Sequence, residues 1–184
     1  MNFIPLTVSL DEACIGDFIR RYHFDDKDKK EILRLLRRVS PRVHAEFHYV
    51  LEEGCAIVVM TLGKAFDELQ EGFLRKGDIH GAYIVDCLGL EFMWAAYDEI
   101  DRELTERTGL HPGDYTYVGE KGLPLSELPM LMSKLGQKQV TYNAGFMLIP
   151  KKSVVFRAPL FEKKVVKHGR CTNCENVSCD LRRA

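Results

Sequence analysis

The sequence predicts a domain that combines helices with strands, and three observations lead to this prediction. Residues 79–107 have the pattern of one long helix whose first half is apolar all round. Residues 42–51 alternate between apolar and polar side chains, as a half-buried strand does, and residues 55–60 form a continuous apolar run, as a strand buried on both faces does. With 184 residues, the chain is long enough to bury a sizeable core.

Composition and charge exclude several classes of partner. The net charge of -1 gives no argument for nucleic acid or an anionic membrane as partner. No apolar run approaches the ~20 residues that cross a bilayer, and residues 1–5 lack the basic start and apolar region of a signal peptide. We therefore expect a cytoplasmic protein, in which the six cysteines are reduced thiols or metal ligands rather than disulfides.

The long helix should be buried over residues 82–90 and half exposed further on, where apolar side chains recur at three- and four-residue spacing up to Leu104. Gly109 and Pro112 end it. Asp86 and Glu91 are carboxylates in apolar surroundings, which require a hydrogen-bonding partner. We expect backbone groups of a neighbouring element to serve them; the alternative is contact with a ligand.

Two shorter helices precede the first strand. Ser9 and Glu12 have the spacing of a capping box for a helix that runs to about Tyr22, with Cys14 on its inner face as a small core residue. A second helix begins at residues 25–26 and ends at residues 40–41, with an apolar stripe and many basic side chains. Its basic face is expected to be solvated; a docking surface for an acidic partner is the alternative.

The polar face of the strand over residues 42–51 carries His44, Glu46 and His48. These side chains are expected to face solvent, although two histidines and a carboxylate could also bind a metal. The buried strand over residues 55–60 then leads into an amphipathic helix over residues 65–74 that ends at Gly77.

The segment that follows the long helix, residues 110–124, combines three glycines, two prolines and two tyrosines. Flexible backbone beside rigid aromatic rings suits the wall of a small-molecule pocket. Ser126 should then cap a short helix that ends at Gly136. Residues 139–149 are predicted as strand, residues 150–153 as a turn and residues 154–156 as the returning strand of a hairpin.

The C-terminal tail differs in character from the rest of the chain. Basic residues lead into Cys171, Cys174 and Cys179, and two cysteines separated by two residues can direct both sulfurs at one ion. His168 is the candidate fourth ligand. Binding of zinc or an iron–sulfur cluster is the prediction; a redox or disulfide role and no role at all are the alternatives.

Four stretches also occur in a particular order. They are residues 56–63, which end in Thr-Leu-Gly, residues 82–89, which contain an internal aspartate, residues 111–115 with 122–125, and residues 140–141 with 146–154. In this order and spacing they resemble the activation (reactivation) domain of cobalamin-dependent methionine synthase, in its small free-standing bacterial form. The resemblance runs from about Cys55 to Arg183 and includes the cysteine tail.

The resemblance implies an α+β fold, with a twisted, mainly antiparallel sheet flanked by helices over residues 1–160 and a cysteine-rich tail over residues 161–184. It also implies an accessory domain that binds S-adenosylmethionine and supports the reductive methylation of a cobalamin carried by a partner methyltransferase. Aromatic faces, carboxylates and carbonyl dipoles recognise a sulfonium cation. The residues expected to bind the cofactor are Pro112, Gly113, Asp114, Tyr115, Tyr117, Asn143 and Phe146.

Two other functions remain open at this point. The chain could be a redox protein that carries a metal or iron–sulfur cluster and delivers an electron to a corrinoid partner. It could also be an interaction module that uses the basic second helix. Whether the domain is itself an enzyme is left open, because in reactions of this kind the cofactors carry the chemistry and the protein supplies positioning.

Overall fold

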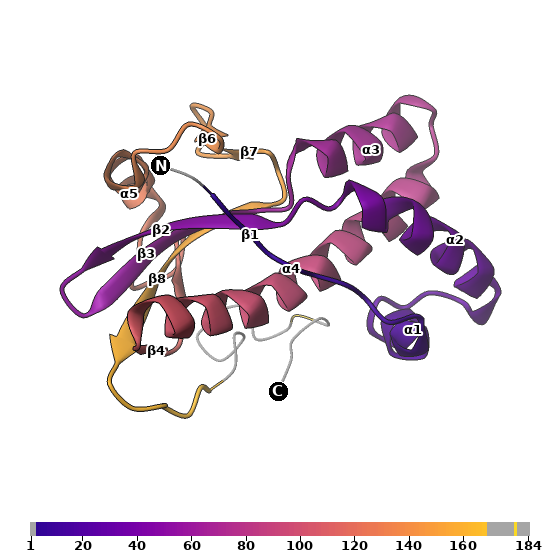
Figure 1. The fold of residues 1–184 in the computed structure, drawn as a ribbon. Helices are drawn as coiled ribbons and strands as arrows, with labels where there is room; N and C mark the ends of the chain where they lie inside the picture. Colours follow the sequence, from indigo (N-terminus) through magenta and orange to yellow (C-terminus); the bar gives the residue numbers. More distant parts are fainter. Residues whose placement is uncertain (1–2, 169–178, 180–184) are drawn as a thin grey trace.

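The computed structural model describes residues 3–168 and residue 179, and it has the predicted α+β fold with a twisted antiparallel sheet. Helices cover one face of the sheet more extensively than the other (Figure 1). The α-helices are α1 (Ile15–Arg21), α2 (Lys29–Val39), α3 (Lys64–Arg75), α4 (Ile79–Thr108) and α5 (Leu128–Leu135). None of the helices in this part of the chain has the length and apolarity that crossing a bilayer requires.

The main sheet has six strands, and every pairing in it is antiparallel. Its centre is formed by β2, β3 and β8, with β1 beyond β2 and with both β4 and β5 on the other side of β8. The strands are β1 (Ile4–Pro5), β2 (Glu46–Glu52), β3 (Cys55–Thr61), β4 (His111–Pro112), β5 (Thr116–Tyr117) and β8 (Ser153–Phe161). The predicted strand over residues 55–60 is confirmed as β3, whose residues from Ala56 to Thr61 are all buried.

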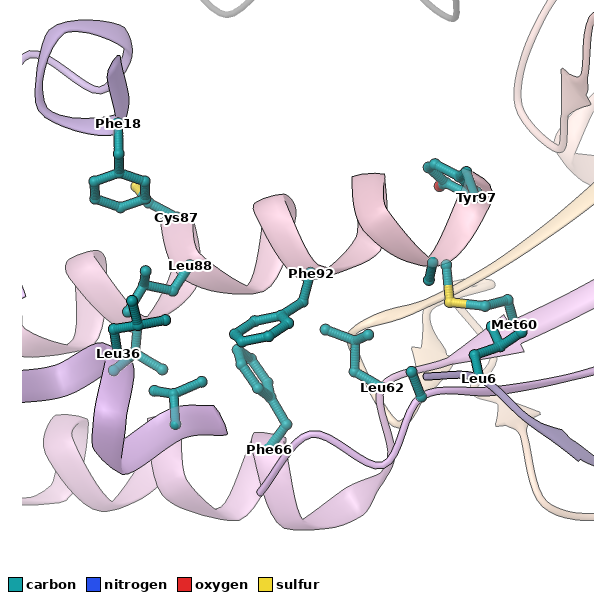
Figure 2. Close-up of a cluster of buried hydrophobic side chains, with 14 of the residues drawn as sticks. Leu6, Phe18, Leu36, Met60, Leu62, Phe66, Cys87, Leu88, Phe92 and Tyr97 are labelled. Carbon is teal, nitrogen blue, oxygen red and sulfur yellow. The ribbon is translucent and has the colours of Figure 1, made fainter. Parts of the chain in front are cut away.

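The larger core lies between the sheet and α4. Figure 2 shows Phe92 of α4 pointing toward Phe66 of α3, and both rings are buried. Gly89 makes this approach possible, because a Cβ at its position would lie 2.6 Å from the Phe66 ring. Cys87 is buried in the same core, and burial raises the pKa of its thiol to about 11. The prediction of one long helix is therefore confirmed, and most of residues 82–90 are buried as predicted, but Tyr83 is 50 % exposed.

The opposite face of the sheet packs on α5 around a smaller core. Ile57, Val59 and Val155 contribute to it from the sheet. His48, expected to face solvent, is instead only 9 % exposed, and its Nε2 lies 3.1 Å from the carbonyl oxygen of Leu135. That carbonyl belongs to the last turn of α5, where backbone oxygens have no partner within the helix. His48 can therefore be buried, because its ring nitrogen has a hydrogen-bonding partner at the end of α5.

The predicted hairpin between residues 139–149 and 154–156 is wrong. The hairpin forms one step earlier, between β6 (Thr141–Tyr142) and β7 (Leu148–Ile149), and β8 pairs with β3 instead. The crossing from β7 to β8 is held by Asp67 of α3, whose buried carboxylate accepts a hydrogen bond of 2.5 Å from the Lys151 amide. The backbone of Lys152 also accepts from the Leu62 amide at 2.9 Å.

Three local predictions near helix starts are also corrected. The first helical turn is capped by Asp11 rather than Ser9, because the Asp11 carboxylate accepts from the Ala13 amide at 2.8 Å. Cys14, predicted in the core, is exposed. Ser126 lies inside a short 3-10 turn that precedes α5, so it does not cap that helix. By contrast, the start of the second helix at residues 25–26 is confirmed by a capping box between Asp25 and Asp28.

Candidate functional site

A groove of about 850 Å³ lies at the edge of the sheet beside the C-terminal half of α4. One wall is α4, a second is β4, and the third is the segment that follows β8. This volume is within the range of small-molecule sites in proteins. The residues that line it are Asp101, Arg102, Thr105, Glu106, His111, Pro112, Lys164, Val165, Val166 and Lys167.

A positively charged group lies against an aromatic ring at this groove. The Nζ atom of Lys167 is 2.5 Å from Oδ2 of Asp101 and 4.5 Å from the centroid of the Tyr115 ring. The hydroxyl of Tyr115 donates a hydrogen bond to Oδ1 of the same aspartate. We call Asp101 and Tyr115 the cation site, because a carboxylate and a ring face both attract a cation.

The path of the chain after α4 explains why Tyr115 lies there. Gly109 ends the helix in the left-handed conformation at φ 71°, as glycine can do without strain. The chain then pairs twice with β8, first through β4 and next through β5. Tyr115 lies between these two pairings, and its ring stacks on Phe156 of β8 with centroids 4.2 Å apart. The ring is only 6 % exposed, so its position is fixed.

Gly113 and Asp114 are brought to the same region. The Gly113 amide donates to the carbonyl of Pro159 at 2.8 Å, and a Cβ there would lie 2.7 Å from the ring of Phe161. Asp114 receives two contacts from His168: the backbone amide at 3.0 Å and Nδ1 at 2.8 Å. The predicted loop therefore faces the segment that follows β8.

Tyr117 belongs to the same aromatic group. It lies on β5 opposite Phe156, and its ring is 5.8 Å from Tyr97 of α4 and 6.2 Å from Tyr115. Five of the seven predicted cofactor-binding residues thus gather at one edge of the α4 face: Pro112, Gly113, Asp114, Tyr115 and Tyr117.

The other two predicted residues lie elsewhere. Asn143 is exposed at the turn of the β6–β7 hairpin, where its Oδ1 accepts from the amides of Gly145 at 2.9 Å and Met147 at 3.0 Å. Phe146 packs against the core on the α5 face. Since Tyr115 packs on the α4 face, the main sheet lies between the two groups (Figure 1). The structure does not bring these two residues to the groove.

Two residues that matter here were not among the predicted site residues. Asp101 was assigned to the exposed half of the long helix, and Lys167 to the basic tail. They are 66 positions apart in the sequence, so no local pattern links them. Nearby, hydrogen bonds from Arg102 to Glu99 and Glu106 raise the pKa of its guanidinium, which therefore stays charged at the rim of the groove.

The two carboxylates of the long helix have side-chain partners rather than the expected backbone partners. Asp86 accepts from Gln70 Nε2 at 2.7 Å and pairs with Lys152 Nζ at 3.0 Å. Glu91 pairs with Arg21 at 2.8 Å and accepts from the Tyr22 hydroxyl at 2.8 Å. Both therefore join α4 to neighbouring elements, and neither lines the groove.

The predicted metal site falls largely outside the described residues, because Cys171 and Cys174 lie there. Of the other two proposed ligands, Cys179 is half-buried and His168 contacts Asp114. Residues 3–168 and Cys179 contain no group of three or more potential metal ligands close enough to hold an ion. Metal or cluster binding by the tail stays a prediction.

At this groove a carboxylate and a ring face, those of Asp101 and Tyr115, both contact one ammonium group, that of Lys167. Comparison with known proteins adds no family to this description. No protein-family model matches the chain, and no curated protein matches it either.

Proposed function

We propose that the chain is an accessory domain that binds S-adenosylmethionine in the groove beside α4. The observation that carries this proposal is the cation site, where Asp101 and Tyr115 already hold an ammonium group. A sulfonium carries the same single positive charge and is recognised by the same two features, a carboxylate and an aromatic face. The resemblance in the loop at residues 111–115 supports the same ligand.

The proposed roles of the residues follow from their positions. Asp101 would hold the charge, and Tyr115 would present its ring while its hydroxyl orients the carboxylate. Pro112 lines the groove, and the Gly113 amide fixes the loop to β8. When bound, the sulfonium donor supplies a methyl group to cobalamin on a partner methyltransferase, after a separate reductant has delivered one electron to the inactive cob(II)alamin.

Calorimetry with two related ligands tests the binding site. Because Lys167 occupies the cation site, the measurement uses the full chain with Lys167→Met, which removes the competing charge. S-adenosylmethionine should bind more tightly than S-adenosylhomocysteine, since the second compound lacks the sulfonium charge. Asp101→Asn in this chain should weaken S-adenosylmethionine by about tenfold or more and leave S-adenosylhomocysteine within about twofold, because a charge-assisted contact is lost.

Glu106→Gln is the matched control for this experiment. Glu106 also lines the groove, but its carboxylate pairs with Arg102 at 3.1 Å rather than with Lys167. Its substitution should leave both affinities nearly unchanged. Equal binding of the two compounds, or equal effects of the Asp101 and Glu106 substitutions, would contradict the proposed site.

The partner is tested separately. Cobalamin-dependent methionine synthase in its cob(II)alamin form is mixed with a chemical reductant, S-adenosylmethionine and the chain. The cobalamin spectrum should change to that of the methylated form faster with the chain present than without it. An unchanged rate, with S-adenosylmethionine binding intact, would reject this partner while the ligand assignment stands.

A further inference from the structure

The segment that follows β8 forms one wall of the groove although few contacts hold it. We call residues 162–168 the strap; in Figure 1 it turns back beneath the C-terminal end of α4. It has no helix or strand, and Val166 is 87 % exposed. Within the described chain, residues 163–166 make no hydrogen bond or ion pair with other elements. The strap is therefore attached mainly through its last two residues.

Each of these two residues contacts one aspartate. Lys167 reaches Asp101 and the Tyr115 ring, and His168 reaches Asp114 through its amide and its Nδ1. Asp101 lies on α4 and lines the groove, and Asp114 lies in the loop after β4. The anchor points of the strap thus coincide with groups that would hold a cationic ligand.

We propose that the strap is an autoinhibitory element in which Lys167 competes with the cationic ligand for the cation site. This inference rests on the proposed function. The Lys167 ammonium lines the groove and lies above the Tyr115 ring, and the ring itself does not line the groove while the lysine is in this place. The cationic ligand reaches Asp101 and Tyr115 in the open state, in which Lys167 has left them, and the closed state excludes it from these two groups.

The strength of the contact suits a reversible closure. The Lys167 and Asp101 side chains are 30 % and 27 % exposed, so water screens part of their attraction. A strap that is closed in about nine molecules of ten lowers the apparent affinity for the ligand about tenfold, in proportion to the open fraction.

The test compares the affinity of full-length variants for S-adenosylmethionine by calorimetry. Lys167→Met keeps the length of the side chain and removes its charge, and it should tighten binding about tenfold relative to the unmodified chain. Lys167→Arg keeps the charge and should bind like the unmodified chain. Lys163→Met is the matched control, because Lys163 is an exposed lysine of the strap that neither lines the groove nor contacts Asp101 or Tyr115.

Hydrogen exchange of the strap gives a readout that does not depend on affinity. The His168 amide, which donates to Asp114, should exchange faster in Lys167→Met than in the unmodified chain. In the unmodified chain, its exchange should become faster when S-adenosylmethionine is added. Exchange that the ligand leaves unchanged would overturn the competition.

The outcomes separate this inference from the function on which it rests. Equal affinity of the unmodified chain and Lys167→Met overturns the strap and leaves the binding site standing. No binding by either chain, including at high ligand concentration, overturns the proposed function and the strap's role with it. Tighter binding in Lys167→Met with unchanged binding in Lys163→Met supports both.

Discussion

The two faces of the main sheet carry different structures. The α4 face supports a large core with the aromatic group of Tyr97, Tyr115, Tyr117 and Phe156, and it ends at the groove. The α5 face supports a smaller, mostly aliphatic core that α5 and the β6–β7 hairpin cover. The α4 face therefore holds most of the buried apolar residues and the candidate site, whereas the α5 face carries only the smaller core.

The difference shows what positions a binding site on this fold. Tyr115 is held at the groove by stacking on Phe156, which is a buried residue of a central strand. A ring fixed in this way loses little further freedom when a ligand binds. On the α5 face, Phe146 lies near the turn of a two-stranded hairpin and is only partly buried. Among the described residues, the aromatic rings that pack on the α5-face core, Phe3 and Phe146, are thus only partly buried, whereas Tyr115 and Phe156 on the α4 face are buried.

The largest expected effect comes from two adjacent residues of β8 that face opposite ways. Phe156→Ala should destabilise the fold by about 3–5 kcal/mol, because it leaves a large cavity on the α4 face and removes the support of Tyr115. Val155→Ala, on the α5 face, should cost about 2 kcal/mol, since only two methyl groups are lost. Urea denaturation at equilibrium measures both values.

The comparison of faces depends on the order of these two values. An equal or greater cost for Val155→Ala would mean that the α5 face contributes as much as the α4 face to the stability of the fold. Ligand binding adds a second criterion: Val155→Ala should retain the affinity for S-adenosylmethionine, because Val155 touches neither the groove nor Tyr115.

The helices were predictable from the sequence where their signals are local. The long helix runs over Ile79–Thr108, close to the predicted range, because both its apolar run and its ending glycine are local features. The capping residue of the first helix was not predictable in this way, because Ser9 and Asp11 are both good capping residues. Only the structure shows which of the two accepts the hydrogen bond from the helix start. The pairing of β8 was missed for another reason: its partner β3 is distant in sequence, and alternation does not name a partner.

The candidate site was predictable only in part, for the same reason. The composition of residues 110–124 indicated a pocket wall, and five predicted residues from this loop do lie together at one edge of the α4 face, although only Pro112 of the five lines the groove. Asp101 and Lys167 could not be predicted as site residues, because only their contact with each other marks them as such. Conversely, Asn143 was grouped with Tyr115 by the order of motifs, and such an order does not reveal that the sheet separates them.

A smaller effect tests how closely α4 approaches its neighbours. Gly89→Ala places a methyl group within 3 Å of the buried Phe66 ring, which should cost about 1–3 kcal/mol. The better helix propensity of alanine offsets about 1 kcal/mol of this, so we expect a net loss of stability. Gly72→Ala on α3, where a Cβ meets nothing within 4 Å, should instead stabilise by about 0.5–1 kcal/mol.

Thermal unfolding of these two glycine variants measures the difference directly. The two substitutions add the same atom to two neighbouring helices, so propensity contributes about equally to both. A stabilised Gly89→Ala protein would mean that the α3–α4 contact is loose. The α4 face would then lack the rigid packing on which the comparison of faces depends.

The smallest effect concerns the α5 face. His48→Ala should destabilise by about 1 kcal/mol, because it removes the hydrogen bond to the Leu135 carbonyl at the end of α5. His44→Ala is the control, since His44 is exposed on the same segment and should change stability by no more than about 0.5 kcal/mol. Hydrogen exchange should locate the loss of protection in α5 and not in α4. Faster exchange in α4 would show that the two faces are energetically coupled through the sheet. The α5 face would then contribute to the stability of the α4 face.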